Sequence, residues 1–276
     1  MTIPALPVPT DLAARLVGTP LLLLLDIDGT ITPIAATPSA AMVSDSVRGA
    51  LGELTRASGV HVAIVTGRSV PDARRLVGVE GAWYAGNHGL EVAPPGGAPT
   101  VTDSVAQFAQ PVEVAATRLA QLVRAVPGAI LENKRWSLSV HYRLAERDSL
   151  PELGLRVRKV ARELGFDVTG GKEVLELRPP VRINKGTAAI DIARRLGALD
   201  DGASILCAGD DETDEDMLSA IRQRSRTAVT VAVEPVLRAR PTAAEFFVGS
   251  PAEMLQLLDA VVLLRAGAVR GGERGS

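Results

Sequence analysis

Two carboxylates follow the most hydrophobic stretch of this 276-residue chain, where five leucines at 21–25 run directly into Asp26, Ile27 and Asp28. An unbroken apolar run of this length predicts a strand buried on both faces, and open α/β sheets bind ligands at the carboxyl ends of such strands. Side chains at positions i and i+2 of an extended backbone point the same way, so both carboxylates can address one substrate or one metal ion. The alternative is that Asp and Gly merely end a strand.

Polar residues that suit phosphate chemistry stand at the other predicted strand and helix ends. Thr66 ends a second apolar run, Lys185 opens a Gly-led helix, and Asp210, Asp211 and Asp214 follow a third run. Carboxylates that converge without a cation repel one another, whereas Mg²⁺ takes one or two carboxylates together with water and phosphate oxygens. A hydroxyl and an ammonium group are donors that suit transferring phosphoryl oxygens. The set predicts phosphoryl transfer, with one Asp as nucleophile and a second carboxylic acid moving the proton.

The elements that must position these residues alternate between strand and helix. Such alternation predicts an α/β fold with a parallel sheet. The predicted strands lie at 21–25, 60–65, 82–85, 204–208, 228–233 and 245–248, and the predicted helices lie at 12–17, 44–57, 71–77, 185–196 and near the C-terminus.

A second pattern interrupts this alternation from about residue 104. It predicts a helix and two strands, then another helix and two strands, at 112–126, 129–132, 136–143, 151–164, 166–169 and 172–178. Gly170 and Gly171 are a two-residue hairpin signal between the last two strands. We therefore expect an α/β core at 1–104 and 184–276 and an inserted domain at 105–183, with an antiparallel sheet and two helices.

Composition and charge exclude several classes of function. The net charge of −2, the lack of a basic block and an aromatic content of 3% argue against nucleic acid as a partner. The single cysteine, Cys207, excludes an internal disulfide and favours a reducing, cytoplasmic location. We expect no membrane partner, because the leucine run is too short to span a bilayer and the chain does not start with a signal-peptide pattern. The apolar stretch 254–269 contains Asp259 and Arg265, which favours an amphipathic surface helix.

Seven strings in a fixed order carry a resemblance to a known family. They are DIDGTITPI at 26–34, VTGRS at 65–69, GNHGLE at 86–91, E-x-K-x-x-S-x-S-x-HYR at 132–143, GKEVLELRP at 171–179, NKG at 184–186 and GDDETDED at 209–216. Together they resemble the trehalose-6-phosphate phosphatases of the haloacid dehalogenase (HAD) superfamily, over nearly the whole chain. The resemblance implies a Rossmann-like HAD core with an inserted cap that determines substrate specificity.

The resemblance also implies a role for each matching residue. Asp26 would be the nucleophile and Asp28 the acid/base, which favours hydrolysis of phosphate monoesters. Mg²⁺ would be held by Asp26, the backbone carbonyl of Asp28 and Asp210, with Asp211 or Asp214 in support, and the phosphate would be bound by Thr66 and Lys185. The residues expected to contact the sugar are Asn87, His88, Glu132, Lys134, Arg143, Lys172 and Glu176.

The function implied is Mg²⁺-dependent hydrolysis of trehalose 6-phosphate through an aspartyl-phosphate, in trehalose biosynthesis, with a functional link to a trehalose-6-phosphate synthase. Two alternatives stay open, a related sugar phosphatase of the sucrose-phosphate or glycosyl-phosphoglycerate type, and a catalytically silent sugar-phosphate sensor.

Some of these residues also have structural interpretations. Asp211 or Asp214 can cap a helix predicted to begin near Glu215, and the charges of the inserted sheet can form a solvated face. Arg68 is expected to pair with a core carboxylate without a catalytic role.

Overall fold

The computed structural model describes residues 9–171, 173–233 and 242–272 and separates into two compact units. Unit 1 comprises Met1–Thr100 and Ile183–Ser276, and unit 2 comprises Val101–Arg182. Among the described residues, no helix is long and apolar enough to cross a membrane.

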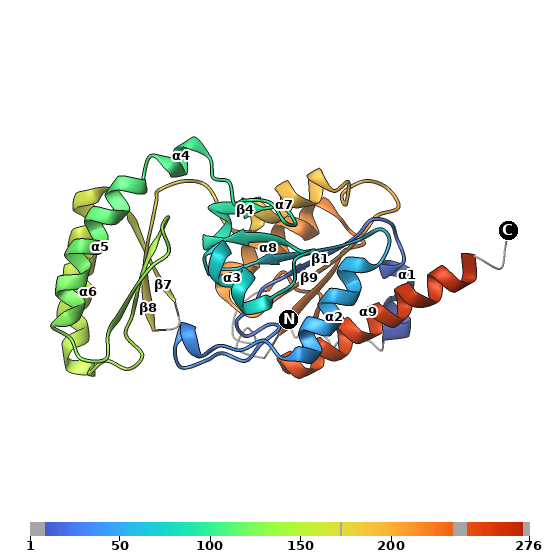
Figure 1. The fold of residues 1–276 in the computed structure, drawn as a ribbon, viewed down its shortest axis with the longest axis horizontal. Helices are drawn as coiled ribbons and strands as arrows, with labels where there is room; N and C mark the ends of the chain where they lie inside the picture. The colour runs from blue at the N-terminus through green and yellow to red at the C-terminus, as the bar shows by residue number, and fades with distance from the viewer. Residues whose placement is uncertain (1–8, 172, 234–241, 273–276) are drawn as a thin grey trace. The chain divides into compact units, whose positions relative to one another are not determined.

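Unit 1 is built on a seven-stranded sheet in the order β11-β10-β9-β1-β2-β3-β4 (Figure 1). Its strands are β1 Leu21–Leu25, β2 Val60–Val65, β3 Trp83–Gly86, β4 Glu91–Ala93, β9 Ser204–Gly209, β10 Val229–Val233 and β11 Phe246–Val248. All neighbours pair in parallel except β3 and β4, which are antiparallel. The edge strand β4 was not among the predicted strands, because its three residues are too few to show a periodic pattern.

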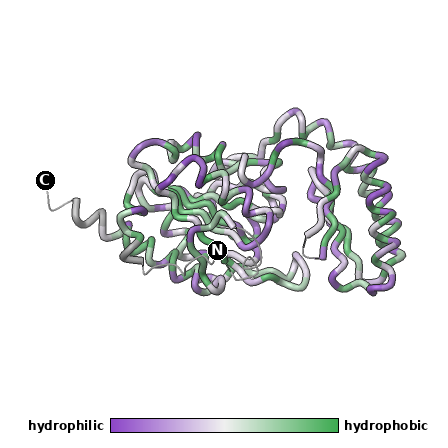
Figure 2. The backbone as a smooth tube through the Cα atoms, turned by 180° about the vertical axis from the view of Figure 1, so that it is seen from behind, coloured by the Kyte–Doolittle hydropathy of each residue, from purple (hydrophilic) through white to green (hydrophobic). Residues whose placement is uncertain are grey.

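The leucines of β1 serve both faces of this sheet. Leu21, Leu23 and Leu25 pack in one apolar cluster, while Leu22 and Leu24 pack in another, and all five side chains are 0% exposed. The first cluster includes residues of α1 (Pro9–Leu16), α2 (Asp45–Arg56), α3 (Val70–Val77) and α9 (Pro251–Gly272), and the second includes residues of α7 (Lys185–Arg195) and α8 (Glu212–Arg224). The strands at the middle of unit 1 are accordingly coloured as hydrophobic along much of their length in Figure 2. Helices on both faces of a largely parallel sheet confirm the predicted α/β core.

The central strand β1 lies at the point where the order in which the chain adds strands to the sheet reverses, because β2 is added on one side of it and β9 on the other. It pairs in parallel with β2 on one side and β9 on the other, and Leu25 is opposite both Ile64 and Ala208. The carboxyl ends of these three strands therefore meet, which brings the residues that follow them to one edge of the sheet. Ligands of doubly wound folds bind at such switch points.

Unit 2 has a four-stranded antiparallel sheet in the order β5-β6-β8-β7. Its elements are α4 Asp103–Ala106, α5 Ala109–Arg124, β5 Ile130–Asn133, β6 Leu138–His141, α6 Leu150–Leu164, β7 Asp167–Gly171 and β8 Val174–Arg178. Residues of α5 and α6 share one apolar cluster with the alternate residues Leu138, Val140, Leu175 and Leu177 of the sheet. This confirms the predicted antiparallel sheet with two main helices. The described part of the chain also has three short 3₁₀ helices, η1 Pro38–Ala40 and η2 Asn87–Gly89 in unit 1 and η3 Arg147–Ser149 in unit 2.

The predicted position of one hairpin turn is wrong. Gly170 and Gly171 do not form the turn but lie in β7, where they pair with Leu175 and Val174. Glu173, just before β8, has a positive φ of 62°. The chain therefore turns two residues later than the glycine signal indicated.

Candidate active site

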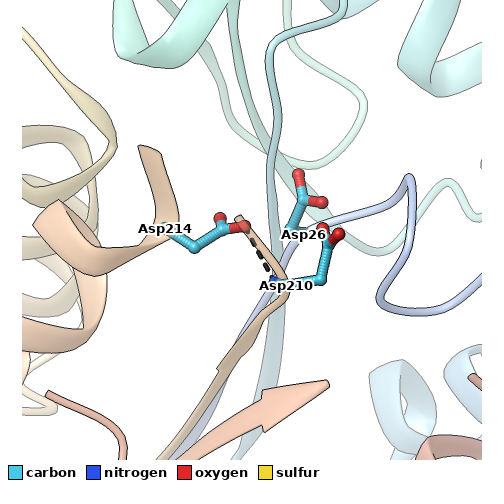
Figure 3. A group of neighbouring side chains, drawn as sticks. All are labelled: Asp26, Asp210 and Asp214. Atoms are coloured by element: carbon cyan, nitrogen blue, oxygen red, sulfur yellow. Dashed lines mark hydrogen bonds between the residues drawn. The ribbon is translucent and has the colours of Figure 1, made fainter. Parts of the chain in front are cut away.

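Three buried carboxylates meet at the carboxyl ends of β1 and β9. An oxygen from each of Asp26, Asp210 and Asp214 lies within 4.8 Å of the others, and their side chains come from two strand ends and α8 (Figure 3). The three residues are 3%, 4% and 0% exposed, respectively. Gly29 makes this packing possible, because its φ is +95° and a Cβ there would lie 2.3 Å from Oδ2 of Asp210.

Lys185 brings a positive charge into this acidic cluster. Its Nζ donates to Oδ1 of Asp26 and to Oδ1 of Asp214, both at 2.8 Å, and the residue is 2% exposed. Lys185 is the first residue of α7, whose start is fixed by a capping box between Asn184 and Thr187. Burial lowers the pKa of Lys185, but the charges of Asp214 and Asp26 outweigh this and raise it well above its ordinary value. The ammonium group therefore stays charged.

Asp211 and Asp214 have different structural roles. Asp211 is the N-cap of α8, and its Oδ1 accepts from the backbone N–H groups of Thr213 and Asp214. The helix begins at Glu212, so the predicted start near Glu215 is wrong by three residues. Burial raises the pKa of Asp211, but the charge of Lys185 and the hydrogen bonds from Thr213 outweigh it and lower the pKa to about 2.

Asp214 ties the loop after β9 to Lys185. Its Oδ2 accepts from the backbone N–H groups of Asp210 at 3.0 Å and Asp211 at 3.2 Å, and its Oδ1 accepts from Lys185. Both oxygens thus already accept hydrogen bonds from the protein. Asp214 therefore fits the role of an anchor for Lys185, while the oxygens of Asp26 and Asp210, which approach each other in Figure 3, fit a cation.

The acidic cluster has more negative charge than the single positive charge of Lys185 can neutralise. Burial is the largest cause that raises the pKa of Asp26, and the charges of Asp210, Asp211 and Asp28 also raise it. Lys185 lowers it, and the net result of all these effects is a pKa of about 7. Crowded carboxylates of this kind are the donor set that a hard divalent cation relieves. The residues present therefore fit a magnesium-type site.

Asp28 does not share the partner of Asp26. Its two oxygens accept from Nε and Nη2 of Arg68 at 2.6 and 2.8 Å. β1 ends at Leu25, so the strand alternation that would send both carboxylates the same way does not extend to Asp28. The expected pairing of Arg68 with a carboxylate is therefore present, and the carboxylate is that of the predicted acid/base.

Thr66, directly after β2, lies beside His88 of η2, the 3₁₀ helix that follows β3. The hydroxyl of Thr66 accepts from the backbone N–H of Arg68 at 3.2 Å, and its carbonyl accepts from the N–H of His88 at 2.9 Å. Gly67 leaves room for the His88 ring, because a Cβ there would lie 2.6 Å from Nε2. Asn87 is instead fully buried, and its amide donates to Oε1 of Glu91 at 2.6 Å, which is a scaffold contact.

Two of the remaining predicted contacts, Glu132 of β5 and Glu176 of β8, lie in unit 2 on the sheet face opposite α5 and α6, and Lys134 directly follows β5. Lys134 and Ser139 both donate to Oε1 of Glu176, at 3.0 and 3.4 Å. Glu132 lies 2.8 Å from Nε2 of His141, a residue that the sequence analysis did not assign although strand alternation puts it on this face. The guanidinium of Arg143 pairs with Glu173 at 2.9 Å, and Lys172 lies outside the described residues.

Comparison with known proteins decides which family this arrangement represents. The family model described as "Trehalose-phosphatase" matches residues 24–252, which include the end of β1, the strands from β2 to β11, and the acids at 26–28 and 210–214. The chain belongs to the trehalose-phosphatase family. It is 37% identical over 237 residues to the trehalose-phosphate phosphatase of Mycobacterium avium, covering 85% of this chain and 60% of that protein. It is also 38% identical over 225 residues to a Mycobacterium tuberculosis protein named as an uncharacterized glycosyl hydrolase, covering 80% of this chain and 17% of that protein.

Solved structures of the same family have the same fold. The chain superposes on a trehalose-6-phosphate phosphatase related protein with a TM-score of 0.78 and 26% identity, covering 90% of this chain and 99% of that one. The C-terminal domain of the Candida albicans trehalose-6-phosphate phosphatase gives 0.77 and 26%, covering 95% and 99%. A HAD-like hydrolase of Bacillus subtilis, at 16% identity and a TM-score of 0.56, shares the fold alone.

Proposed function

We propose that this chain hydrolyses trehalose 6-phosphate to trehalose and phosphate. The observation that carries the proposal is the buried contact between Lys185 and Asp26 beside Asp210, at the carboxyl edge of the sheet. The family and the relatives named above support it. The chain spans about 60% of the length of the M. avium relative and 17% of the M. tuberculosis one, so its activity is argued from the residues present here.

In the proposed reaction, an oxygen of Asp26 attacks the phosphorus while the bond to the sugar oxygen breaks. Asp28 gives its proton to that sugar oxygen, so trehalose leaves as a neutral alcohol and an aspartyl-phosphate remains. Asp28, now a carboxylate, removes a proton from water as the water attacks the phosphorus. Phosphate leaves and Asp26 is restored. Lys185 and Thr66 hold the phosphoryl oxygens during both steps.

Mg²⁺ is the cation that we propose for the acidic cluster. Asp26 and Asp210 would hold it through side-chain oxygens, with the backbone carbonyl of Asp28, while Asp214 positions Lys185 and Asp211 caps α8. When bound, the ion would neutralise charge on the phosphoryl oxygens and on Asp26.

The raised pKa of Asp26 predicts how Mg²⁺ binding depends on pH. Because the pKa is about 7 without a metal, Mg²⁺ must displace a proton below that pH, and we expect the affinity to fall about tenfold for each pH unit below 7. Above about pH 8 the affinity should level off. Isothermal titration at pH 6 and pH 8, in buffers of different ionisation enthalpy, measures both the affinity and the protons released. Equal affinity at the two pH values would contradict the assignment of Asp26 as a ligand.

The polar face of the unit 2 sheet is the surface that we propose for the sugar. Glu132, Lys134 and Glu176 offer charged donors and acceptors there, which suit the hydroxyl groups of a disaccharide. The contact of Lys134 with Glu176 and that of Glu132 with His141 hold these side chains in place, so they are not separately solvated charges. Arg143 and His88 remain candidates for contacts with the same substrate.

Glu176→Gln is expected to separate sugar recognition from phosphate chemistry. It removes a charged acceptor that holds Lys134, so kcat/KM for trehalose 6-phosphate should fall about 10- to 100-fold. The same ratio for p-nitrophenyl phosphate should change little. Glu152→Gln is the matched control, because Glu152 pairs only with Arg156 on the exposed side of α6 among the contacts described. Equal losses on both esters would show that Glu176 supports the fold and does not read the sugar.

Phosphate release from a panel of sugar phosphates, with Mg²⁺ and with a chelator, tests the proposed function. Release confined to trehalose 6-phosphate and lost with the chelator is the expected result. Preference for sucrose 6-phosphate or a glycosyl phosphoglycerate would keep the chemistry and change the substrate. The same fold occurs, at 14% identity, in the C-terminal domain of a Candida albicans protein named as a trehalose synthase regulatory protein, so activity is judged by turnover and not by fold. Tight binding of sugar phosphates without turnover would therefore favour a sensor.

A further inference from the structure

Arg68 is a buried charged residue near the site that the proposed reaction does not use. Its guanidinium makes a two-point contact with Asp28, through Nε to Oδ2 and Nη2 to Oδ1. The remaining nitrogen, Nη1, donates to Oδ2 of Asp72 at 2.7 Å and to the carbonyl of Pro38 at 3.1 Å. Arg68 is 7% exposed and its guanidinium is shielded from water, whereas the side chain of Asp28 is 33% exposed and remains accessible.

The contacts of Arg68 join three separate pieces of unit 1. Asp28 belongs to the loop after β1, Pro38 begins η1, and Asp72 lies in the first turn of α3. Burial raises the pKa of Asp72, but hydrogen bonds from Arg68 and Arg75 outweigh it, so the net shift is downward and Asp72 remains a carboxylate. An anionic anchor of this kind fixes the guanidinium independently of Asp28. The position and plane of the Arg68 guanidinium are therefore fixed by contacts other than its contact with Asp28.

The two carboxylates after β1 have different cationic partners. Asp26 is held by Lys185 and Asp28 by Arg68. A group that first gives a proton to the leaving oxygen and then takes one from water has to be placed accurately at both steps. When Asp28 carries the proton on one oxygen, its other oxygen can still accept from Arg68, and Asp72 keeps the guanidinium in place throughout.

We propose that Arg68 is a positioning residue for proton transfer, which holds the carboxyl of Asp28 at the leaving oxygen and takes no part in the attack by Asp26. The inference rests on the proposed function, because it gives Asp28 the acid/base role. Arg68 acts only through Asp28. Its removal should therefore lower kcat/KM most for substrates whose leaving group must be protonated.

Two esters with different leaving groups test this directly. A sugar alkoxide leaves poorly without a proton, whereas p-nitrophenolate leaves readily as an anion. For Arg68→Gln, we expect kcat/KM for the sugar phosphate to fall about 100-fold, within the range that general acid catalysis contributes. For p-nitrophenyl phosphate, we expect kcat/KM to stay close to that of the wild type, because this ratio reports steps only up to loss of the leaving group.

Arg75→Gln is the matched control. Arg75 pairs with the other oxygen of Asp72, its side chain is 76% exposed, and the contact with Asp28 is left intact. This variant should keep wild-type kcat/KM on both esters. Asp72→Asn, which weakens the anchor but leaves Arg68 in place, should show the same selective loss as Arg68→Gln at a smaller size. It also keeps the test decisive if Arg68→Gln does not fold.

The outcomes distinguish this inference from the proposed function. Equal losses on the two esters, or no loss on either, would overturn the role of Arg68. If the wild type does not release phosphate from trehalose 6-phosphate but does so from another sugar phosphate, the proposed substrate fails. The comparison of Arg68→Gln is then made with that ester and p-nitrophenyl phosphate. No turnover of any phosphate ester would overturn both.

Discussion

Asp26→Asn is expected to lower phosphate release by about 10⁴-fold or more, because the amide cannot attack phosphorus to form the aspartyl-phosphate. The fold should survive. The amide oxygen of Asn can still accept from Lys185, and Lys185 keeps its second contact, at 2.8 Å, with Asp214. The loss of activity should therefore come from the missing nucleophile and not from unfolding. Quenched-flow labelling with radioactive substrate should trap a hydroxylamine-sensitive phosphoprotein with the wild type and none with Asp26→Asn.

The same substitution has a predictable effect on the stability of the metal-free protein. The pKa of Asp26 is about 7 in the folded state against an ordinary value of 3.8, so between about pH 4 and pH 7 the folded state binds a proton that the unfolded chain does not. The free energy of unfolding therefore falls as pH rises through this window and stays low above it. The Asp26→Asn variant has no such carboxyl group, so its free energy of unfolding should not fall in this way. At pH 8 without Mg²⁺ it should be at least as stable as the wild type, and the difference should shrink as the pH approaches 4.

Asp191→Asn is the control for both measurements. Asp191 lies on α7, the helix that begins with Lys185, but its carboxylate is 47% exposed and pairs with Arg195. This variant should retain activity and the pH dependence of stability. Residual turnover by Asp26→Asn well above 10⁻⁴ of the wild-type rate, after exclusion of deamidation to Asp, would remove Asp26 from the role of nucleophile.

The central strand and its neighbours could be predicted because burial on both faces leaves a plain signal. Leu21 to Leu25 alternate between the two apolar clusters, so none of the five positions tolerates a polar residue. Parallel pairing then places Thr66 and Asp210 beside Asp26 without further information. The motif order was therefore enough to indicate both the fold and the acids at the edge of the sheet.

Details that depend on competition between similar residues could not be predicted. Asp211 and Asp214 both have the carboxylate that a helix N-cap needs, and only the structure distinguishes them, through the contact of Asp214 with Lys185. Gly170 and Gly171 have the composition of a turn, but pairing with β8 continues through both of them. In each case a tertiary contact overrides a local preference.

The contact between Arg68 and Asp28 shows a further limit of the sequence. The two residues are 40 positions apart, and the sequence indicated only that Arg68 needs some carboxylate. Which carboxylate it takes follows from the parallel pairing of β1 with β2, since the loops after both strands emerge at the same edge. The identity of the partner gives Arg68 a role as a positioning residue for Asp28, in addition to its structural contacts.

Lys185→Met is expected to damage stability and activity together. Lys185 is 2% exposed and donates to two buried carboxylates, so its loss leaves Asp26 and Asp214 without their ammonium partner. Removal of one member of a buried ion pair costs about 3–5 kcal/mol of unfolding free energy. Phosphate release should also fall, because a donor to the phosphoryl oxygens is lost. Activity alone therefore cannot separate a structural role of Lys185 from a role in the reaction.

The double variant Lys185→Met/Asp214→Asn separates the two effects. Asp214→Asn removes one of the two carboxylates that lose their ammonium partner, while the amide oxygen of Asn and the packing around α8 remain. We expect the double variant to regain much of the unfolding free energy lost by Lys185→Met, measured by urea denaturation at pH 8. Phosphate release should stay as low as in Lys185→Met, because no cation has been returned to the phosphate. If activity recovers together with stability, Lys185 serves only to neutralise Asp26 and Asp214, and the phosphate must be bound by other residues.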